Sequence, residues 1–122
     1  MARLFVLLAA LLSPLAALAG PDAFFGLGLR TELDGTFWNP VLSSASIAEI
    51  APNSPTAKGG LAVGDVVLTI EGLTVSGAKG DEFEKIKGIL AKKPAIGDTL
   101  HLTLRRPNSQ VYSAVLIAEP RP

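Results

Sequence analysis

Near its start the sequence carries Gly26-Leu27-Gly28-Leu29, a tetrapeptide in which glycine and leucine alternate. Glycine weakens the interior of a strand and gives it no side chain to pack, so the tetrapeptide makes a poor core strand. It suits a position where another backbone or a ligand approaches closely, because a residue without a Cβ leaves its amide unshielded. A tight bend before the first strand is the other interpretation, and four residues alone do not separate the two.

This tetrapeptide lies near the start of the first predicted strand, and a turn follows that strand. The run from Phe24 predicts a strand that ends at the turn signal Asp34-Gly35. The aromatic pair Phe37-Trp38 follows directly. We favour a loop in which this pair covers one end of the core. An exposed patch beside a ligand groove is the alternative, because large apolar surface that stays exposed usually marks an interaction site.

A strand and a short helix come next. The alternation in Ser46–Ala51 predicts a strand with Ile47 and Glu49 on one face. Ser54 is placed to cap a short helix, and Pro55 begins it, since proline loses no hydrogen bond at the first helical position.

The rest of the chain predicts a hairpin, a longer helix and two closing strands. Gly64-Asp65 turns the chain into Val66–Ile70, which is apolar and β-branched. Asp81 is expected to cap a helix of about a dozen residues. Leu100–Arg105 and Val111–Ile117 are expected to close the sheet. One core is expected to hold Leu61, Val66, Leu68, Ile70, Leu102 and Leu104.

Residues 1–19 have the layout of a secretory signal peptide. A short basic start at Arg3 precedes a nearly unbroken apolar run, and small residues stand just before the expected cleavage between Ala19 and Gly20. The run is short for a bilayer span, so a retained anchor is the weaker interpretation. We therefore expect export, to the bacterial periplasm or as a secreted protein, with no membrane anchor after cleavage.

The composition excludes several kinds of function. Eleven basic and eleven acidic side chains cancel, so nothing indicates a nucleic-acid partner. The chain has no cysteine and a single histidine, His101, which leaves little material for a metal site or an acid–base pair. No serine has a histidine placed to activate it. We expect neither catalysis nor a cofactor.

In order and spacing, these segments resemble a PDZ domain of the bacterial type, as attached to tail-specific (carboxyl-terminal processing) and periplasmic trypsin-like proteases, here without a protease domain. The resemblance implies an α+β, mainly β fold, a partly open five- to six-stranded barrel or sandwich with one short and one longer helix. It covers residues 24–118, between a lead-in at 20–23 and a tail at 119–122.

The resemblance also implies a binding site for an extended peptide or a protein C-terminus. The loop Gly26, Leu27, Gly28, Leu29 would bind a terminal carboxylate through the amides of its last three residues. The ligand would then add as a strand beside residues 29–33, which include Thr31. Phe83, Lys87 and Leu90 would face it from the longer helix. Many animal relatives have a histidine at the position of Phe83, so a hydrophobic C-terminus is the expected ligand. A second register of the loop, Phe25-Gly26-Leu27, also fits the pattern.

Three functions follow from the resemblance. The first is a peptide- and protein-binding module, expected to be monomeric, whose partner the sequence does not identify. The second is a scaffold whose groove is vestigial or filled by its own Phe37-Trp38 loop or tail. The third is an accessory subunit of a periplasmic protease.

Overall fold

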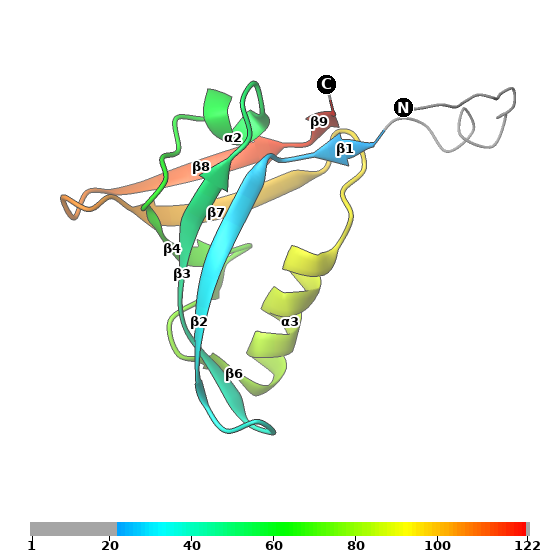
Figure 1. Ribbon diagram of the computed structural model, residues 1–122. Coiled ribbons are helices and arrows are strands. Elements are labelled where there is room, and N and C mark those ends of the chain that lie inside the picture. The colour runs from blue at the N-terminus through cyan, green and yellow to red at the C-terminus, as the bar shows by residue number, and fades with distance from the viewer. Residues whose placement is uncertain (1–21, 122) are drawn as a thin grey trace, which may run out of the picture.

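The computed structural model describes residues 22–121, and the candidate signal peptide with its Ala19–Gly20 cleavage site lies outside them. The described residues form nine strands and two helices, arranged as in Figure 1. They are β1 (Ala23–Phe24), β2 (Leu27–Gly35), β3 (Pro40–Ile50), α2 (Pro55–Lys58), β4 (Val66–Ile70), β5 (Leu73–Thr74), β6 (Ala78–Lys79), α3 (Gly80–Ala91), β7 (Thr99–Arg105), β8 (Val111–Ile117) and β9 (Glu119–Pro120).

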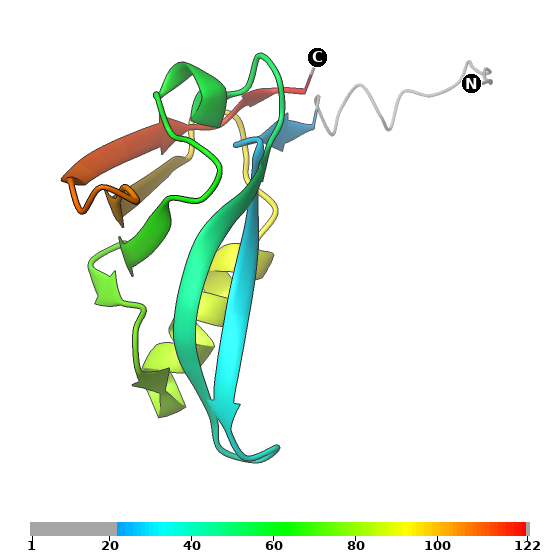
Figure 2. The same cartoon turned by 60° about the vertical axis from the view of Figure 1, so that its left-hand side comes forward.

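The main sheet is antiparallel, with strand order β2-β3-β4-β7-β8. The short strands β5 and β6 pair with β4 and β3, while β1 and β9 form a separate two-stranded sheet. The predicted mainly β fold with one short and one longer helix is confirmed. β2 is the last strand at one edge of the main sheet, and α3 runs beside this edge (Figure 2).

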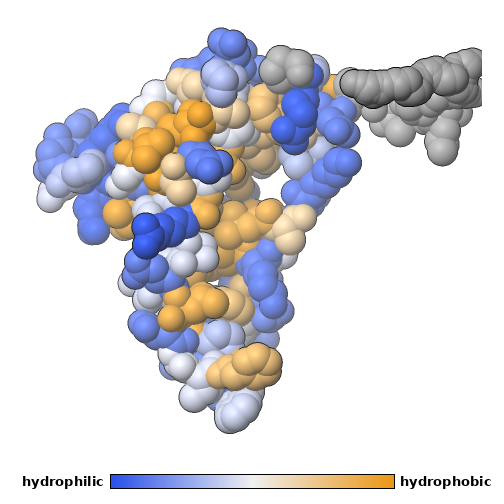
Figure 3. Space-filling model, in the orientation of Figure 1, coloured by the Kyte–Doolittle hydropathy of each residue, from blue (hydrophilic) through white to orange (hydrophobic). Residues whose placement is uncertain are grey.

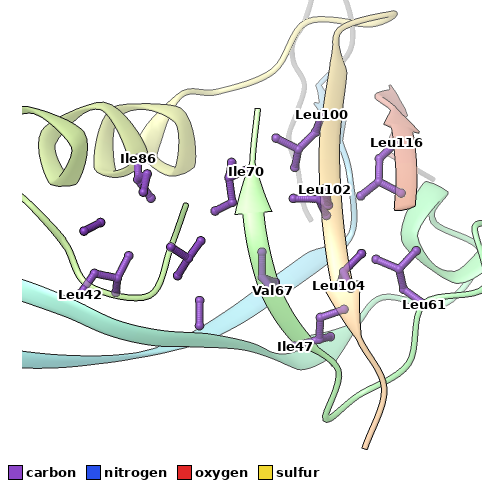
Figure 4. Close-up of a cluster of buried hydrophobic side chains, with 13 residues drawn as sticks. Leu42, Ile47, Leu61, Val67, Ile70, Ile86, Leu100, Leu102, Leu104 and Leu116 are labelled. Atoms are coloured by element: carbon purple, nitrogen blue, oxygen red, sulfur yellow. The ribbon is translucent and has the colours of Figure 1, made fainter. Parts of the chain in front are cut away.

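The core lies between α3 and the inner face of the sheet (Figure 4). Four of the predicted core residues are buried there: Leu61, Ile70, Leu102 and Leu104. The prediction was wrong for Val66 and Leu68, which are only half-buried, because the β4–β7 register shifts between Val67 and Thr69. This β-bulge lets residues three apart, Val67 and Ile70, share the inner face.

A second β-bulge lies in β3, and the alternation predicted for Ser46–Ala51 is wrong because of it. Gly28 pairs with Glu49 and Leu29 pairs with Ile47, so Ala48 is an extra residue on β3. Ile47 is therefore buried, while Glu49, two residues on, is exposed instead of sharing its face.

The two helices begin differently. Ser54 caps α2 as predicted, because its side chain accepts a hydrogen bond from the Ala57 N–H at 3.2 Å. The predicted cap of α3 at Asp81 is wrong: Lys79 is the N-cap, and it makes no side-chain capping bond. Asp81 lies inside the first turn, where its charge suits the helix dipole.

Asp65 is fully buried and joins three segments of the chain. It accepts hydrogen bonds from the Ala62 N–H at 3.2 Å, from Arg106 at 3.1 Å and from the Tyr112 hydroxyl. The guanidinium of Arg106 also lies 4.3 Å from the centre of the Tyr112 ring. The bonds of Arg106 and Tyr112 to Asp65 hold the β7–β8 turn against the turn before β4.

Candidate functional site

A groove of about 900 Å³ lies between the edge of β2 and the C-terminal end of α3. Figure 3 shows the opening, with hydrophobic surface on one side and a hydrophilic strip on the other. Leu27, Leu29, Ile50 and Leu100 contribute apolar surface from the sheet, and Ile89 contributes it from the helix. The groove is therefore apolar inside and polar at its rim.

Six of the eight residues predicted for the site line this groove: Gly26, Leu27, Gly28, Leu29, Thr31 and Leu90. The other two, Phe83 and Lys87, lie nearer the start of α3 and do not line it. Phe83 is half-buried against the core, and the Lys87 ammonium lies 5.5 Å from the centre of its ring and 3.3 Å from the Glu84 carboxylate. Ile89 of α3 also lines the groove.

The backbone of Leu29 faces the open edge of the sheet. Its cross-strand neighbour Ile47 uses both backbone groups on the opposite side, where its N–H donates to the Asp65 carbonyl and its carbonyl accepts from the Gly64 N–H, each at 2.9 Å. Antiparallel pairs either exchange both backbone bonds or none, so Leu29 and Ile47 exchange none. The N–H and C=O of Leu29 therefore point away from β3. Thr31, two residues on in an unbroken register, points the same way.

Leu27 presents its backbone to the same edge. The Ala51 N–H donates to the Gly26 carbonyl at 2.9 Å, which makes Gly26 and Ala51 a hydrogen-bonded pair. The next pair, Leu27 and Ile50, is then a non-bonded one, and Leu27 faces outward. By the same alternation, the backbone groups of Gly28 turn toward β3. The open edge thus carries free backbone donors and acceptors at every second residue.

Gly26 fixes the start of this edge. Its φ of +79° lies in the left-handed region, and a Cβ added there would lie 2.1 Å from the Cβ of Ser54. The carbonyl of its neighbour Phe25 accepts hydrogen bonds from the backbone N–H and the hydroxyl of Thr56, at 3.1 and 2.8 Å. The loop before β2 is thereby anchored on α2, and glycine is required there for packing as well as for conformation.

Three cations line the groove at this end, and sequence reasoning missed them. Lys92 and Lys93 come from the end of α3, and Arg121 comes from the segment after β9. The sequence showed the lysines as only an isolated pair. It placed Arg121 in a tail with no structural signal, since a strand of two residues has no hydrophobic pattern.

A smaller cavity of about 340 Å³ lies beneath the end of α3, and Glu71 lines it. The Glu71 carboxylate accepts a hydrogen bond from the His101 backbone N–H, which holds the pKa of that carboxyl below its usual value. The imidazole Nδ1 of His101 also lies 3.1 Å from this carboxylate. The side chain of His101 is exposed on β7.

The aromatic pair at the β2–β3 turn neither covers the core nor fills the groove. Phe37 and Trp38 are 92% and 80% exposed, and their rings meet edge to face at 6.1 Å. The favoured prediction of a core-covering loop is therefore wrong. The turn is closed on itself by two backbone bonds between Thr36 and Asn39, each 3.2 Å, so the pair extends past the end of the sheet.

Residues 22–121 were found to contain neither a metal-binding cluster nor a membrane-spanning helix. No group of three or more histidine, aspartate or glutamate side chains there is arranged to hold a metal ion. None of the helices in the described part of the chain has the length and apolar character needed to cross a membrane.

Comparison with known proteins supports the fold. No family model matches the sequence. A 73-residue segment, 60% of this chain, is 35% identical to serine protease HTRA1 from Xenopus tropicalis and spans 14% of that protein's length. The PDZ domain of HtrA3, solved with the phage-derived ligand FGRWV, matches with a TM-score of 0.52 and 25% identity over 80% of this chain and 86% of that domain.

Two larger proteases contain the same fold. The photosystem II D1 C-terminal processing protease matches with a TM-score of 0.56 and 23% identity over 85% of this chain and 24% of its own. The HtrA-type protease AlgW, solved with a decapeptide, matches with a TM-score of 0.50 and 20% identity over 84% of this chain and 30% of its own. Residues 22–121 therefore form a PDZ-like domain, similar to those of HtrA-type and carboxyl-terminal processing proteases, and contain no protease domain.

Proposed function

We propose that this chain is a peptide-binding module that captures an extended segment or a protein C-terminus by adding it as a strand beside β2. The observation that carries this proposal is the outward-facing backbone of Leu27, Leu29 and Thr31 along an apolar groove. A sheet edge with unpaired N–H and C=O groups is a template for another strand. The peptide ligands in the HtrA3 and AlgW structures agree with this use of the fold.

The groove favours a hydrophobic ligand side chain. Leu27, Leu29, Ile89 and Leu90 present apolar surface to whatever lies beside β2. We infer that a ligand residue such as valine or leucine occupies this space, because burial of its side chain contributes about 1.5–3 kcal/mol. Free hydrophobic C-termini are therefore the first ligands to test.

We further infer that the chain binds without chemistry of its own. Within residues 22–121 the His101 imidazole lies against Glu71, and no serine hydroxyl there is hydrogen-bonded to it. The groove itself is lined by backbone, apolar side chains and a few charges. Capture of a partner is the function that this arrangement supports.

The test is a pair of substitutions at Thr31. Thr31→Pro removes the outward N–H of residue 31 but no hydrogen bond to β3. An edge strand tolerates proline at such a position, where the N–H faces away from the sheet. Thr31→Ala keeps that N–H and is the matched control. Fluorescence polarisation would measure binding of FGRWV and of labelled pentapeptides that end in valine, leucine, isoleucine or phenylalanine. A change of about 1.4 kcal/mol shifts the dissociation constant tenfold.

We expect Thr31→Pro to weaken binding roughly tenfold or more, since it removes a backbone bond and obstructs the added strand. Thr31→Ala should bind like the wild type, and both variants should melt within a few degrees of it. If the proline variant binds as tightly as the alanine variant, strand addition beside β2 is ruled out. If the wild-type protein binds none of these peptides, the proposed function itself fails.

We also propose that the protein is exported and that residues 1–19 are removed. Extracytoplasmic binding of peptides agrees with the basic start, the apolar run and the small residues before Gly20. Intact-mass measurement of protein recovered from the cell envelope should show Gly20 as the first residue. A retained Met1 would contradict export by this route.

A further inference from the structure

The main sheet has two edges, β2 and β8, and they differ in how they are protected. The exposed part of β2 carries the charged side chains of Arg30, Glu32 and Asp34, and its register with β3 shifts twice. Charges and bulges are two means by which an edge strand avoids pairing with another chain. β8 has neither, since its sequence VYSAVLI contains no charge and no proline, and its register with β7 is unbroken.

The backbone of β8 is open along its outer edge. Just beyond one end of the strand, the Ala118 N–H donates to the Asp98 carbonyl at 2.8 Å. Just beyond the other end, the Arg106 N–H donates to the Gln110 carbonyl, also at 2.8 Å. Because hydrogen-bonded and non-bonded pairs alternate between these ends, every second residue of β8 points its N–H and C=O away from β7. No strand or loop among residues 22–121 bonds to these outward groups, which belong to Val111, Ser113, Val115 and Ile117.

The same four residues have exposed side chains on the outer face of the sheet. Val111, Val115 and Ile117 are 57%, 55% and 54% exposed. Figure 2 shows β8 at the border of the sheet that is remote from β2 and α3. An edge with free backbone groups and a row of β-branched side chains is suited to pair with another strand.

We propose that β8 pairs antiparallel with β8 of a second copy of this chain, in a closed two-fold dimer. The outward residues are spaced symmetrically about Ala114. A two-fold axis there sets Val111 opposite Ile117 of the second copy and Ser113 opposite Val115 of the second copy. All the outward backbone groups of both strands are then hydrogen-bonded at once. Ala114 meets its own copy on the axis, where a small side chain suits the close approach of a non-bonded pair.

The charges and the topology agree with a second copy as the occupant. An uncharged strand sets no like charges opposite each other across the axis, and a chain without net charge does not repel its copy. The joined sheet ends at β2 in both copies, so the unprotected edge is covered in each. No β8 residue lines the peptide groove, which stays open in the dimer. The inference differs from the monomer that the sequence predicts, and it does not depend on the proposed function.

The experiment is sedimentation equilibrium over a range of concentrations, on protein recovered from the cell envelope. Four proteins are compared: the wild type, Ser113→Glu, Val115→Lys and Val63→Lys. Both β8 substitutions change exposed side chains, and thermal melting checks that each variant still folds. Val63 is 60% exposed before β4, and it controls for replacement of an exposed valine by lysine outside the sheet. The fifth sample is an equimolar mixture of Ser113→Glu and Val115→Lys.

We expect the wild type and Val63→Lys to form dimers whose mass does not grow further with concentration. Ser113→Glu and Val115→Lys, each alone, should dimerise about tenfold or more weakly, because two like charges then lie diagonally across the axis in an apolar strand pair. The mixture should recover a dimer with one copy of each variant. In that dimer the introduced glutamate of one copy lies directly opposite the introduced lysine of the other.

Four results would overturn the inference. A wild type that stays monomeric at every concentration would leave the β8 edge to a different protein. Undiminished dimers in both β8 variants would place the interface on another surface. A mixture that associates no more than its components would rule out antiparallel pairing about Ala114. A mass that grows without limit would show open-ended assembly in place of a closed dimer. Peptide binding, measured separately by fluorescence polarisation, should be the same in the wild type and in both β8 variants, since β8 does not line the groove.

Discussion

Replacing Gly26 by alanine should destabilise the domain in two separable ways. A left-handed φ costs a residue with a Cβ about 1–2 kcal/mol. Overpacking adds about 1–3 kcal/mol, because the new Cβ would lie 2.1 Å from the Cβ of Ser54 and 2.4 Å from its Oγ. Alanine also restricts the unfolded chain, which returns about 0.4–1 kcal/mol. The expected net loss is about 1–4.5 kcal/mol.

Gly60→Ala is the matched control, since Gly60 has a φ of +82° and no atom within 4 Å of an added Cβ. It should lose only about 0–1.5 kcal/mol, the conformational part alone. A third protein combines Gly26→Ala with Ser54→Gly, which removes the atoms that clash and costs a helix cap only a few tenths of a kcal/mol by itself.

Urea unfolding at pH 7, followed by circular dichroism, would measure all three. With a denaturant dependence of about 2 kcal/mol per molar, the middle of the usual range for small proteins, Gly26→Ala should lower the midpoint by roughly 0.5–2 M. In the Ser54→Gly background the same change should cost about as much as Gly60→Ala does. If Gly26→Ala is no more destabilising than Gly60→Ala, the contact with Ser54 does not hold the start of the groove, and the reasoning is wrong.

The remaining predictions concern the core and the buried carboxylate. Ile70→Ala should cost about 2–5 kcal/mol, whereas Leu68→Ala should cost only about 1 kcal/mol because Leu68 is half-buried; equal losses in urea would contradict the bulge in β4. Burial and the hydrogen bond to Asp65 raise the pKa of Tyr112 from 10.0 to about 12. The neutral hydroxyl therefore stabilises the fold fully below about pH 10, and its contribution is lost as the pH rises toward 12. Tyr112→Phe should lose about 1.5–3 kcal/mol at pH 7 and should abolish that alkaline dependence; an unchanged alkaline slope would exclude Tyr112 as its source.

The cap of α2 was predictable because it has a local chemical signal, whereas the α3 cap predicted at Asp81 was wrong. Ser54 and Pro55 begin α2 as their side chains dictate. Gly26 was recognised as special, but for an incomplete reason. The sequence indicated only an unshielded amide, whereas the structure adds a left-handed φ and a contact with Ser54, which lies 28 positions away in the chain.

The β-bulges were not predictable from local pattern. An extra residue such as Ala48 changes which side chains are buried after it, yet it leaves no mark in the composition. Strict alternation therefore assigned Val66 and Leu68 to the core in place of Val67. The choice is made by pairing with β7, a strand more than thirty residues away in the sequence.

The lining of the groove was predicted better where backbone forms it than where side chains do. The glycine pattern indicated the loop at Gly26, the resemblance implied the edge of β2, and residues of both line the groove. Phe83 and Lys87 have the right helical spacing for one face, but the groove opens beside the other end of α3. The cations of the groove come from the end of α3 and from the segment after β9, which meet at Asp22: its carboxylate lies 3.4 Å from the Lys93 ammonium, and its carbonyl accepts from the Arg121 N–H. No periodic pattern in the sequence indicates this meeting.

The pairing of β1 with β9 also has a mechanical consequence. It places Ala23 opposite Pro120, so the described chain enters and leaves the domain side by side (Figure 1). Tension between these two points would separate the two strands one backbone bond at a time, whereas the long β2–β3 ladder lies away from the line of pull. The groove rim that carries Arg121 would therefore open at a lower force than the longer ladders of the main sheet.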